Sequence, residues 1–490
     1  MLAAVTNNHD QEGVGQEASA PAWARRVPAD LHYRSATEVA RSIAAGELTS
    51  VEATGTILDR ISVIDPVLRS YAIVTTERAL ADAATLDAEL AAGRRRGPLH
   101  GVPIAVKDLF DVAGVPRGAG MPIHRATVPT GDGTVVARLR AAGAVILGKL
   151  QMTEGAFGVH HPAIPAPLNP WHADYWTGVS SSGSGAATAA GLCFLSLGSD
   201  TGGSIRFPST MNGLTGLKPT WGRVSRAGVF PLAESLDHVG PICRSALDAA
   251  LAMSIIAGPD PDDPTAAPLE VEDYVGLIGS GVEGKRLGVL RDLDGLDSDA
   301  ERVYGTATLT MAQAGATIVD VELPPDFDQA GRDWVALCSV EAALAHESTY
   351  PARATDYGPV LADTLEMGRR TSGLEFARMQ RRRARLTGEL TQLLASVDLL
   401  LLPVMGVAAP TIEDMRKAGR APEAVARRLR FTAPFDLSGQ PTLTLPGGMN
   451  TDGVPIGFQI VGRAFDEADV LAAGHAYQRA TDWHLRHPRL

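Results

Sequence analysis

The stretch Leu197-Gly-Ser-Asp-Thr-Gly-Gly-Ser-Ile-Arg-Phe-Pro208 contains two consecutive glycines directly before a serine. The short apolar run from Cys193 to Leu197 leads into it, which predicts a strand that enters a tight turn. Because Gly202 and Gly203 lack side chains, the turn can bring successive backbone N–H groups to one point and form a nest for an oxyanion. Ser204 lies at the edge of this nest, so we expect its hydroxyl to be a nucleophile.

A serine hydroxyl is a weak nucleophile near neutral pH, so the site requires a base. His238 follows Asp237, but no Gly-x-Ser-x-Gly sequence frames a serine near the loop, and this disfavours a Ser-His-Asp triad. A lysine can be the base where burial keeps it neutral. Lys107 follows the apolar residues 104–106, which predict a buried strand, and it is a candidate base; Lys149 is a weaker rival.

Several segments resemble the diagnostic sequences of the amidase signature family. The Gly/Ser-rich run of that family is similar to Gly178-Val-Ser-Ser-Ser-Gly-Ser-Gly-Ala-Ala187, and its Gly-Gly-Ser-Ile-Arg sequence is present at residues 202–206. The spacing of the two catalytic serines in relatives is kept between Ser180 and Ser204. The likeness extends from about Ser35 to Pro488 and includes residues 216–225, 235–241 and 453–462.

The resemblance implies a Ser-Ser-Lys triad and a reaction. Lys107 would be the base, Ser180 the proton relay and Ser204 the nucleophile that forms an acyl-enzyme. The reaction would be hydrolysis of a carboxylic amide or anilide to an acid plus ammonia or an amine, with no metal and no organic cofactor. The backbone N–H groups that bind the oxyanion would be those of Thr201, Gly202, Gly203 and Ser204.

Two residues depart from the commonest family sequence. Val179 and Ser182 stand where many members have glycine. The resemblance still implies a cis peptide bond before Ser180, and Ser182 adds a hydroxyl near the relay serine. These changes suggest a sub-branch of the family that keeps every catalytic group.

The substrate pocket is expected to involve aromatic and apolar residues near the serine loop. A proline-rich segment, residues 162–170, leads into that loop and carries aromatic residues at its end. Other pocket residues are suggested by position or by the resemblance. The predicted set is Trp171, Tyr175, Trp176, Phe207, Met405 and Phe431.

The residue types that bind metals do not occur at coordinating spacings. His160 and His161 lie in the same proline-rich region without partner ligands at a zinc-like spacing. The acidic residues of the segment 259–264 are interrupted by prolines, so we interpret the segment as a surface turn and not as a calcium site. We therefore expect no metal.

Composition favours a cytoplasmic enzyme, and the resemblance implies that its partner is a small-molecule amide substrate. The formal net charge of −12 argues against a nucleic-acid partner, and the basic run at residues 381–385 is expected to be a solvated helix face. No apolar run approaches the ~20 residues of a membrane helix. The three cysteines are predicted to be buried free thiols in a reducing compartment, and a homodimer is compatible with the sequence: Cys193, Cys243 and Cys338.

The fold class implied by the resemblance is α/β, with a mixed, twisted central sheet covered by helices. Capping boxes predict helices that begin after Ser35 and Thr49, the second ending at Pro66, and a helix is also expected at 134–142 before a strand at 145–147. We expect a flexible segment at 1–27 and a single amidase signature domain at 28–488. Its parts would be a catalytic core at about 70–250, a substrate-shaping region at about 260–435 and a C-terminal return to the core at about 436–488.

Three alternatives use other functions or residues. The first is the glutaminase subunit of a tRNA-dependent amidotransferase, which would use the same serines and pass ammonia to a partner. The second is a non-catalytic binding protein on an amidase scaffold, which the presence of Lys107, Ser180 and Ser204 disfavours. The third is a cysteine nucleophile at Cys193, which its predicted position inside a buried strand disfavours.

Overall fold

A single mixed sheet of eleven strands runs through the computed structural model, which describes residues 27–291 and 294–490. Two groups of neighbours are parallel: β3, β2 and β4, and then β9, β7 and β8. The other neighbouring pairs are antiparallel. The spatial order is β1 (Tyr71–Val74), β3 (Val145–Leu150), β2 (Pro103–Lys107), β4 (Ser196–Asp200), β6 (His238–Cys243), β5 (Thr215–Lys218), β10 (Thr442–Met449), β11 (Pro455–Val461), β9 (Leu399–Pro403), β7 (Arg286–Val289) and β8 (Thr317–Asp320).

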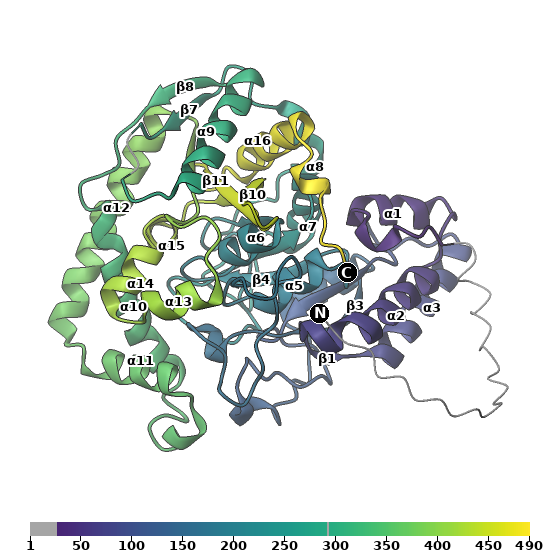
Figure 1. Ribbon diagram of the computed structural model, residues 1–490. Coiled ribbons are helices and arrows are strands. Elements are labelled where there is room, and N and C mark those ends of the chain that lie inside the picture. Colours follow the sequence, from purple (N-terminus) through teal and green to yellow (C-terminus); the bar gives the residue numbers. More distant parts are fainter. Residues whose placement is uncertain (1–26, 292–293) are drawn as a thin grey trace, which may run out of the picture.

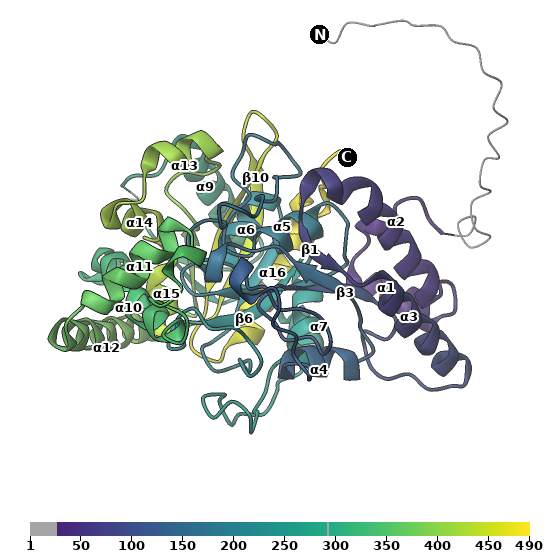
Figure 2. The same cartoon turned by 90° about the horizontal axis from the view of Figure 1, so that it is seen from below.

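Helices cover this sheet, as the α/β prediction requires. Figures 1 and 2 place one group at the end of the sheet that carries β1, namely α1 (Ala36–Ala44), α2 (Ser50–Leu68) and α3 (Thr76–Ala91). A second group lies on the opposite side of the molecule: α10 (Ala330–Ala345), α11 (Pro359–Arg370), α12 (Gly373–Ser396), α13 (Ile412–Ala418), α14 (Pro422–Arg428) and α15 (Ala433–Ser438). The remaining helices are α4 (Thr134–Ala141), α5 (Ser182–Ala189), α6 (Arg206–Asn212), α7 (Ala246–Ile256), α8 (Tyr274–Leu277), α9 (Ser298–Gln313) and α16 (Glu467–Ala480).

Local sequence signals predicted the starts of α1 and α2 correctly. Ser35 and Thr49 each form a complete capping box, the first with Glu38. The predicted end of α2 was wrong, because the helix continues through Pro66 to Leu68. A proline in the last turn removes only one hydrogen bond, and the chain then leaves the helix at Arg69, whose φ is 58°.

The strand that leads to the nucleophile loop is displaced from its predicted position. It was expected at residues 193–197, but β4 begins at Ser196 and ends at Asp200, so Cys193 precedes it. Pairing with β6 extends the strand through Ser199 and Asp200, polar residues that the apolar pattern did not include. The same cause lengthens β3, which continues through Lys149 because β1 and β2 pair with it.

The basic run at 381–385 lies on α12, as predicted, but it is not a fully solvated face. Arg382 forms an ion pair with Asp333, and Arg383 donates to the carbonyl groups of Leu437 and Ser235. These residues therefore attach α12 to the rest of the protein.

Other predictions concern the cysteines, the ends of the chain and the membrane. All three cysteines are buried free thiols, as expected. The predicted flexible segment at 1–27 lies outside the described residues except for Val27. Within residues 27–291 and 294–490, no helix has both the length and the apolar character needed to cross a membrane.

Candidate active site

The sheet brings the candidate base and the two serines to one edge. Neighbouring parallel strands β2 and β4 end at the same edge, so Lys107, the last residue of β2, lies beside the loop that follows β4. Ser180 reaches this edge from the loop before α5, after a cis Val179–Ser180 peptide bond, as the resemblance implied. The Nζ atom of Lys107 lies 2.7 Å from Ser180 Oγ. The predicted base and relay serine are therefore in direct contact.

Burial brings the pKa of the Lys107 amine close to neutral pH. Its side chain has no exposed surface. Burial lowers the pKa of Lys107 to about 7, although Asp237 and Asp200 act in the opposite direction. Among the described residues, no carboxylate forms an ion pair with Lys107; its second hydrogen bond goes to Ser199 Oγ, at 2.8 Å. A lysine in these surroundings can accept a proton near neutral pH.

The turn before Ser204 needs both of its glycines. A Cβ atom on Gly202 would lie 2.5 Å from the ring of Trp334. Gly203 has a φ of 124°, and a Cβ atom on it would lie 2.5 Å from the ring of Phe207. Ser204 is half-buried and lines a cavity. These contacts support the predicted reason for the Gly-Gly sequence.

Three of the four predicted oxyanion donors have no hydrogen-bond partner within residues 27–291 and 294–490. The N–H of Gly203 instead donates to Asp200 Oδ1, at 2.6 Å, because the Asp200 side chain turns back over the loop. Among the hydrogen bonds of the described residues, none uses the N–H groups of Thr201, Gly202 or Ser204. Ser204 Oγ likewise has no hydrogen-bond partner among the described residues. In active sites, hydrogen bonds between catalytic groups often form fully only when substrate binds.

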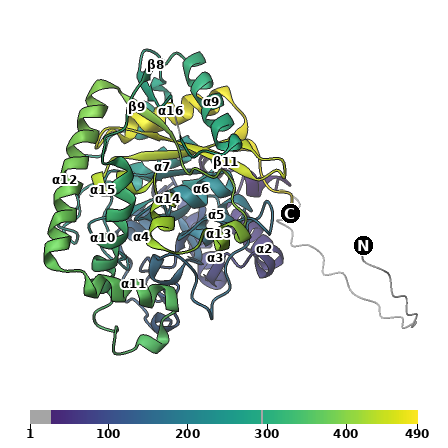
Figure 3. The ribbon, with the colours of Figure 1, turned by 60° about the vertical axis from the view of Figure 1, so that its left-hand side comes forward.

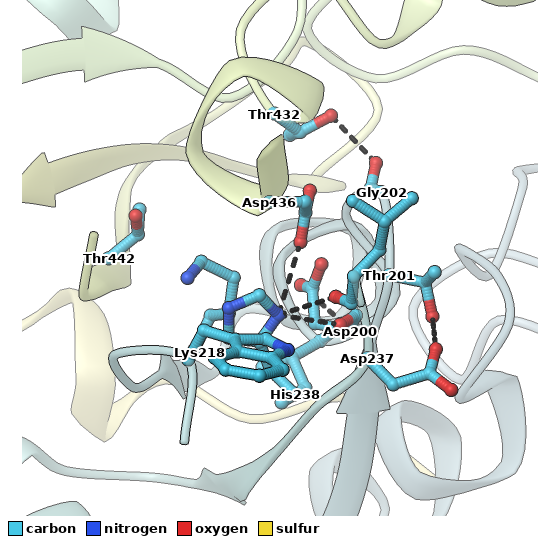
Figure 4. A network of polar contacts seen from close by, with 12 residues as sticks. Asp200, Thr201, Gly202, Lys218, Asp237, His238, Thr432, Asp436 and Thr442 are labelled. Carbon is cyan, nitrogen blue, oxygen red and sulfur yellow. Dashed lines mark hydrogen bonds and ion pairs between the residues drawn. The ribbon is translucent and has the colours of Figure 1, made fainter. Parts of the chain in front are cut away.

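Side chains from distant segments hold the carbonyl groups of this loop. Trp334 Nε1 donates to the carbonyl oxygen of Thr201 at 2.5 Å, and Thr432 Oγ1 donates to that of Gly202 at 2.8 Å. The hydroxyl of Thr201 donates to Asp237 Oδ1 at 2.6 Å. Figure 4 shows the last two contacts on opposite sides of the loop. With its carbonyl groups fixed in this way, the loop can present its free N–H groups to a substrate.

A buried ionic cluster lies behind the loop (Figure 4). Arg206 forms ion pairs with Asp200, at 2.9 Å, and with Asp436, at 2.5 Å. Burial alone would raise the pKa of Asp200, but the attraction of Arg206 holds it below its ordinary value. For Asp436 the effect of burial dominates, and its pKa is raised. Asp200 also accepts the N–H of Ile205, so the cluster positions the residues on both sides of Ser204.

His238 belongs to this cluster and not to a catalytic triad. Its Nδ1 atom lies 2.7 Å from the carbonyl oxygen of Leu236. Burial and the neighbouring Lys218 lower the pKa of His238 well below its ordinary value. No hydrogen bond joins it to Ser204 among the described residues, which agrees with the sequence argument against a Ser-His-Asp arrangement.

The other rival groups also lie in separate surroundings. Lys149 is in a buried ion pair with Asp108, at 3.1 Å. Cys193 is buried, and burial raises the pKa of its thiol to about 11, so it is a poor nucleophile. His160 Nε2 lies 2.9 Å from Ser182 Oγ, which gives the unusual Ser182 hydroxyl a partner. The described residues include no group of three or more His, Cys, Asp or Glu residues that could hold a metal ion.

The cavity at Ser204 has a volume of about 260 Å³. Its wall is mainly apolar and includes Phe157, Phe207, Leu232, Trp334, Val335 and Leu429. Of the six predicted pocket residues, only Phe207 lines it. The other five lie elsewhere. Trp176 packs against Phe207, and Met405 and Phe431 are buried in the core. The Trp171 indole donates a hydrogen bond to the carbonyl oxygen of Asn212, and the Tyr175 hydroxyl donates one to the Asp452 carboxylate.

Several residues of the site were not predicted from the sequence. Ser199 and Asp200 stand within the quoted stretch, five and four positions before Ser204, and a polar pair at the end of a buried strand is a usable signal. Trp334 and Thr432 are more than a hundred residues away in the chain, and only the fold brings them to the loop.

Replacing Trp334 with phenylalanine tests the support of the loop. The substitution keeps an aromatic ring at this position and removes the hydrogen bond to Thr201, so we expect kcat to fall about 5- to 10-fold, since one such bond contributes about 1 kcal/mol. The matched control is Trp176→Phe. The centroid of the Trp176 ring lies 5.7 Å from that of Phe207, and the indole N–H of Trp176 has no partner among the described residues. Equal losses in both variants would contradict a specific role for Trp334.

Comparisons with known proteins agree with this geometry. The family model described as Amidase matches residues 52–471. The chain is 49% identical to the amidase candidate AmiD of Mycobacterium tuberculosis, over 92% of this chain and 95% of that protein. It is 37% identical to a glutamyl-tRNA(Gln) amidotransferase subunit of Chloroflexus aggregans, over 94% and 99%. Among solved structures, a 6-aminohexanoate cyclic dimer hydrolase is 27% identical, with a TM-score of 0.84 and coverage of 94% and 99%.

Proposed function

This chain belongs to the amidase family and is a hydrolase of amide carbon–nitrogen bonds, and we propose that it forms an acyl-enzyme on Ser204 with Ser180 as relay and Lys107 as base. The observation that carries the proposal is the 2.7 Å contact between Lys107 Nζ and Ser180 Oγ. A buried lysine whose pKa is about 7 can hold the proton that leaves the serines.

In the first half of the reaction, Ser204 attacks the amide carbonyl carbon. The Ser204 proton passes to Ser180 Oγ as the Ser180 proton passes to Lys107. A tetrahedral intermediate forms, and its oxyanion accepts hydrogen bonds from the N–H groups of Thr201, Gly202 and Ser204. Because Trp334 and Thr432 already hold the loop, little reorganisation is needed as this charge develops.

In the second half, the leaving nitrogen must gain a proton before the carbon–nitrogen bond breaks. Ser180 donates this proton and recovers one from Lys107, which returns the amine to its neutral form. Water then attacks the acyl-enzyme by the same relay and releases the acid. Every proton is held by a protein group or by the substrate at each step.

The cavity favours a small amide with an apolar body. Its volume of about 260 Å³ lies slightly below the ~300 Å³ at which ligand pockets commonly begin, and its wall is mainly apolar. We place the enzyme in the cytoplasm, because three buried free thiols suit a reducing compartment. We also propose that the single domain comprises a catalytic core at about 70–250, a substrate-shaping region at about 260–435 and a C-terminal return to the core at about 436–488.

Glutamine hydrolysis within an amidotransferase is the second candidate. It is favoured by the 37% identity to the glutamyl-tRNA(Gln) amidotransferase subunit of Chloroflexus aggregans. The 49% identity to AmiD and the apolar cavity favour a free-standing amidase. A non-catalytic role is the least favoured, because Lys107 and both serines are in place.

A substrate panel separates these candidates. The purified chain is incubated alone with aliphatic, aryl and peptide amides, anilides, esters and glutamine, and the acids formed are measured by mass spectrometry. We expect turnover of apolar amides without a partner. Turnover of glutamine alone, or only in the presence of a second subunit, would instead support the amidotransferase, and the absence of any turnover would support the non-catalytic role.

A further inference from the structure

The cavity that contains Ser204 has a charged side as well as an apolar one. Its charged lining residues are Asp363 on α11, Arg420 before α14 and Arg428 at the end of α14. Asp363 and Arg420 are exposed to solvent, whereas Arg428 is half-buried. Ser204 precedes α6, whereas Arg428 ends α14, which Figures 1 and 3 show near α13. Arg428 and the nucleophile therefore line one cavity from different elements of the fold.

The Arg428 guanidinium has no acidic partner in the described part of the chain. Its one hydrogen bond is donated by a terminal nitrogen to the carbonyl oxygen of Gly419, at 3.3 Å. Burial lowers its pKa, and no neighbouring carboxylate offsets this effect. The contrast with Arg430 is clear, because Arg430 forms an ion pair with Asp328 at 2.7 Å. Arg428 thus keeps most of its five N–H donors free at the cavity wall.

A half-buried cation without a counter-charge is costly unless a ligand supplies one. The planar guanidinium fits a carboxylate through two parallel hydrogen bonds. Asp363 does not supply that charge, because it is exposed on α11, and the hydrogen-bond partner of Arg428 is the carbonyl oxygen of Gly419. The apolar wall of the same cavity would meanwhile contact a hydrocarbon chain, for instance at Val335, Val425 and Leu429.

We propose that Arg428 is a specificity residue that binds a carboxylate carried by the amide substrate at the end away from the scissile bond. The substrate class is then a small amide with an apolar body and one terminal carboxylate. This inference rests on the proposed function, since it assigns the distal end of the substrate of the same site. The carboxylate can belong to the acyl part or to the leaving amine, and the two cases have different test substrates.

The experiment compares matched amides with and without the carboxylate. For the acyl part the pair is adipamic acid and hexanamide; for the amine part it is N-acetyl-5-aminopentanoate and N-pentylacetamide. We expect Arg428→Met to lower kcat/KM for the carboxylated member of one pair about 10- to 100-fold and to change that of the neutral member less than about twofold. The pair that responds identifies which part of the substrate carries the carboxylate. Arg428→Lys should keep part of the preference.

The control is Arg427→Met, because Arg427 is the exposed neighbour on α14 and does not line the cavity. Equal losses on charged and neutral amides, equal losses in the two arginine variants, or a wild-type preference for the neutral member of both pairs would overturn the proposal. Binding of adipate to the Ser204→Ala protein, with and without Arg428→Met, is measured by calorimetry. If adipate binding depends on Arg428 but the wild-type protein hydrolyses no amide, the proposed function is wrong and the anion site is supported. If the wild-type protein hydrolyses amides but adipate binding does not depend on Arg428, the anion site is wrong and the proposed function is supported.

Discussion

Ser204→Ala is expected to lower kcat/KM for every amide substrate by ~10⁴-fold or more, because no other group can form the acyl-enzyme. The remaining activity would come from the oxyanion donors and from binding alone. The measurement is steady-state hydrolysis of the best substrate of the panel. Mass spectrometry of the quenched enzyme adds a direct result, since an acyl adduct should appear on the peptide that contains Ser204 and be absent from the variant.

The matched control is Ser209→Ala. Ser209 is buried, lies on α6 only five positions away, and donates its hydroxyl to the carbonyl oxygen of Ile205. Its loss should affect stability slightly and the chemistry little. Circular dichroism of both variants checks the fold. An unchanged rate for Ser204→Ala, or an adduct that persists in it, would require a different nucleophile.

The features of the site that are local in the sequence were predictable. The Gly-Gly turn, the capping boxes and the buried strand before Lys107 depend on neighbouring residues, and each is present where the pattern placed it. The contact between Lys107 and Ser180 joins positions far apart in the chain. It could be expected only through the family resemblance, which assigns both residues to one triad.

The features that depend on long-range packing were not predictable from the sequence. The aromatic residues near the serine loop looked like pocket residues, but the indole N–H of Trp171 is used by the carbonyl oxygen of Asn212, and the Tyr175 hydroxyl is used by Asp452. The indole that does reach the loop is that of Trp334, on a helix from the opposite layer. Aromatic side chains have the same composition signal in both places, and only the fold decides which of them meet the substrate.

The strands show the same limit on a smaller scale. The apolar pattern predicted a strand that ends at Leu197, because Ser199 and Asp200 are polar. In the sheet these two residues continue β4, since β6 pairs with them and their side chains bond to Lys107 and Arg206. The polar residues that ended the predicted strand are thus the ones that position the base and the nucleophile loop.

The base can be identified by its pH dependence. Only the neutral amine can accept a proton, so kcat/KM should rise as the pH increases through about 7, where the Lys107 amine loses its proton, and then level off. Lys107→Ala should lower kcat/KM by ~10²- to 10⁴-fold, the usual contribution of a general base, and remove this rising limb. The measurement is a pH profile of both proteins, with circular dichroism at each pH to exclude unfolding.

Asp237 is the group that could imitate this profile, because burial raises its pKa to about 6 and it lies near Lys107. Asp237→Asn separates the two assignments. If Lys107 is the base, the rising limb persists in this variant and its midpoint moves to lower pH, because the negative charge that raised the Lys107 pKa has been removed. If Asp237 is the titrating group, the limb disappears with it. A midpoint that stays in place after Lys107→Ala would likewise exclude the lysine, so the two variants together assign the proton to one of the two side chains.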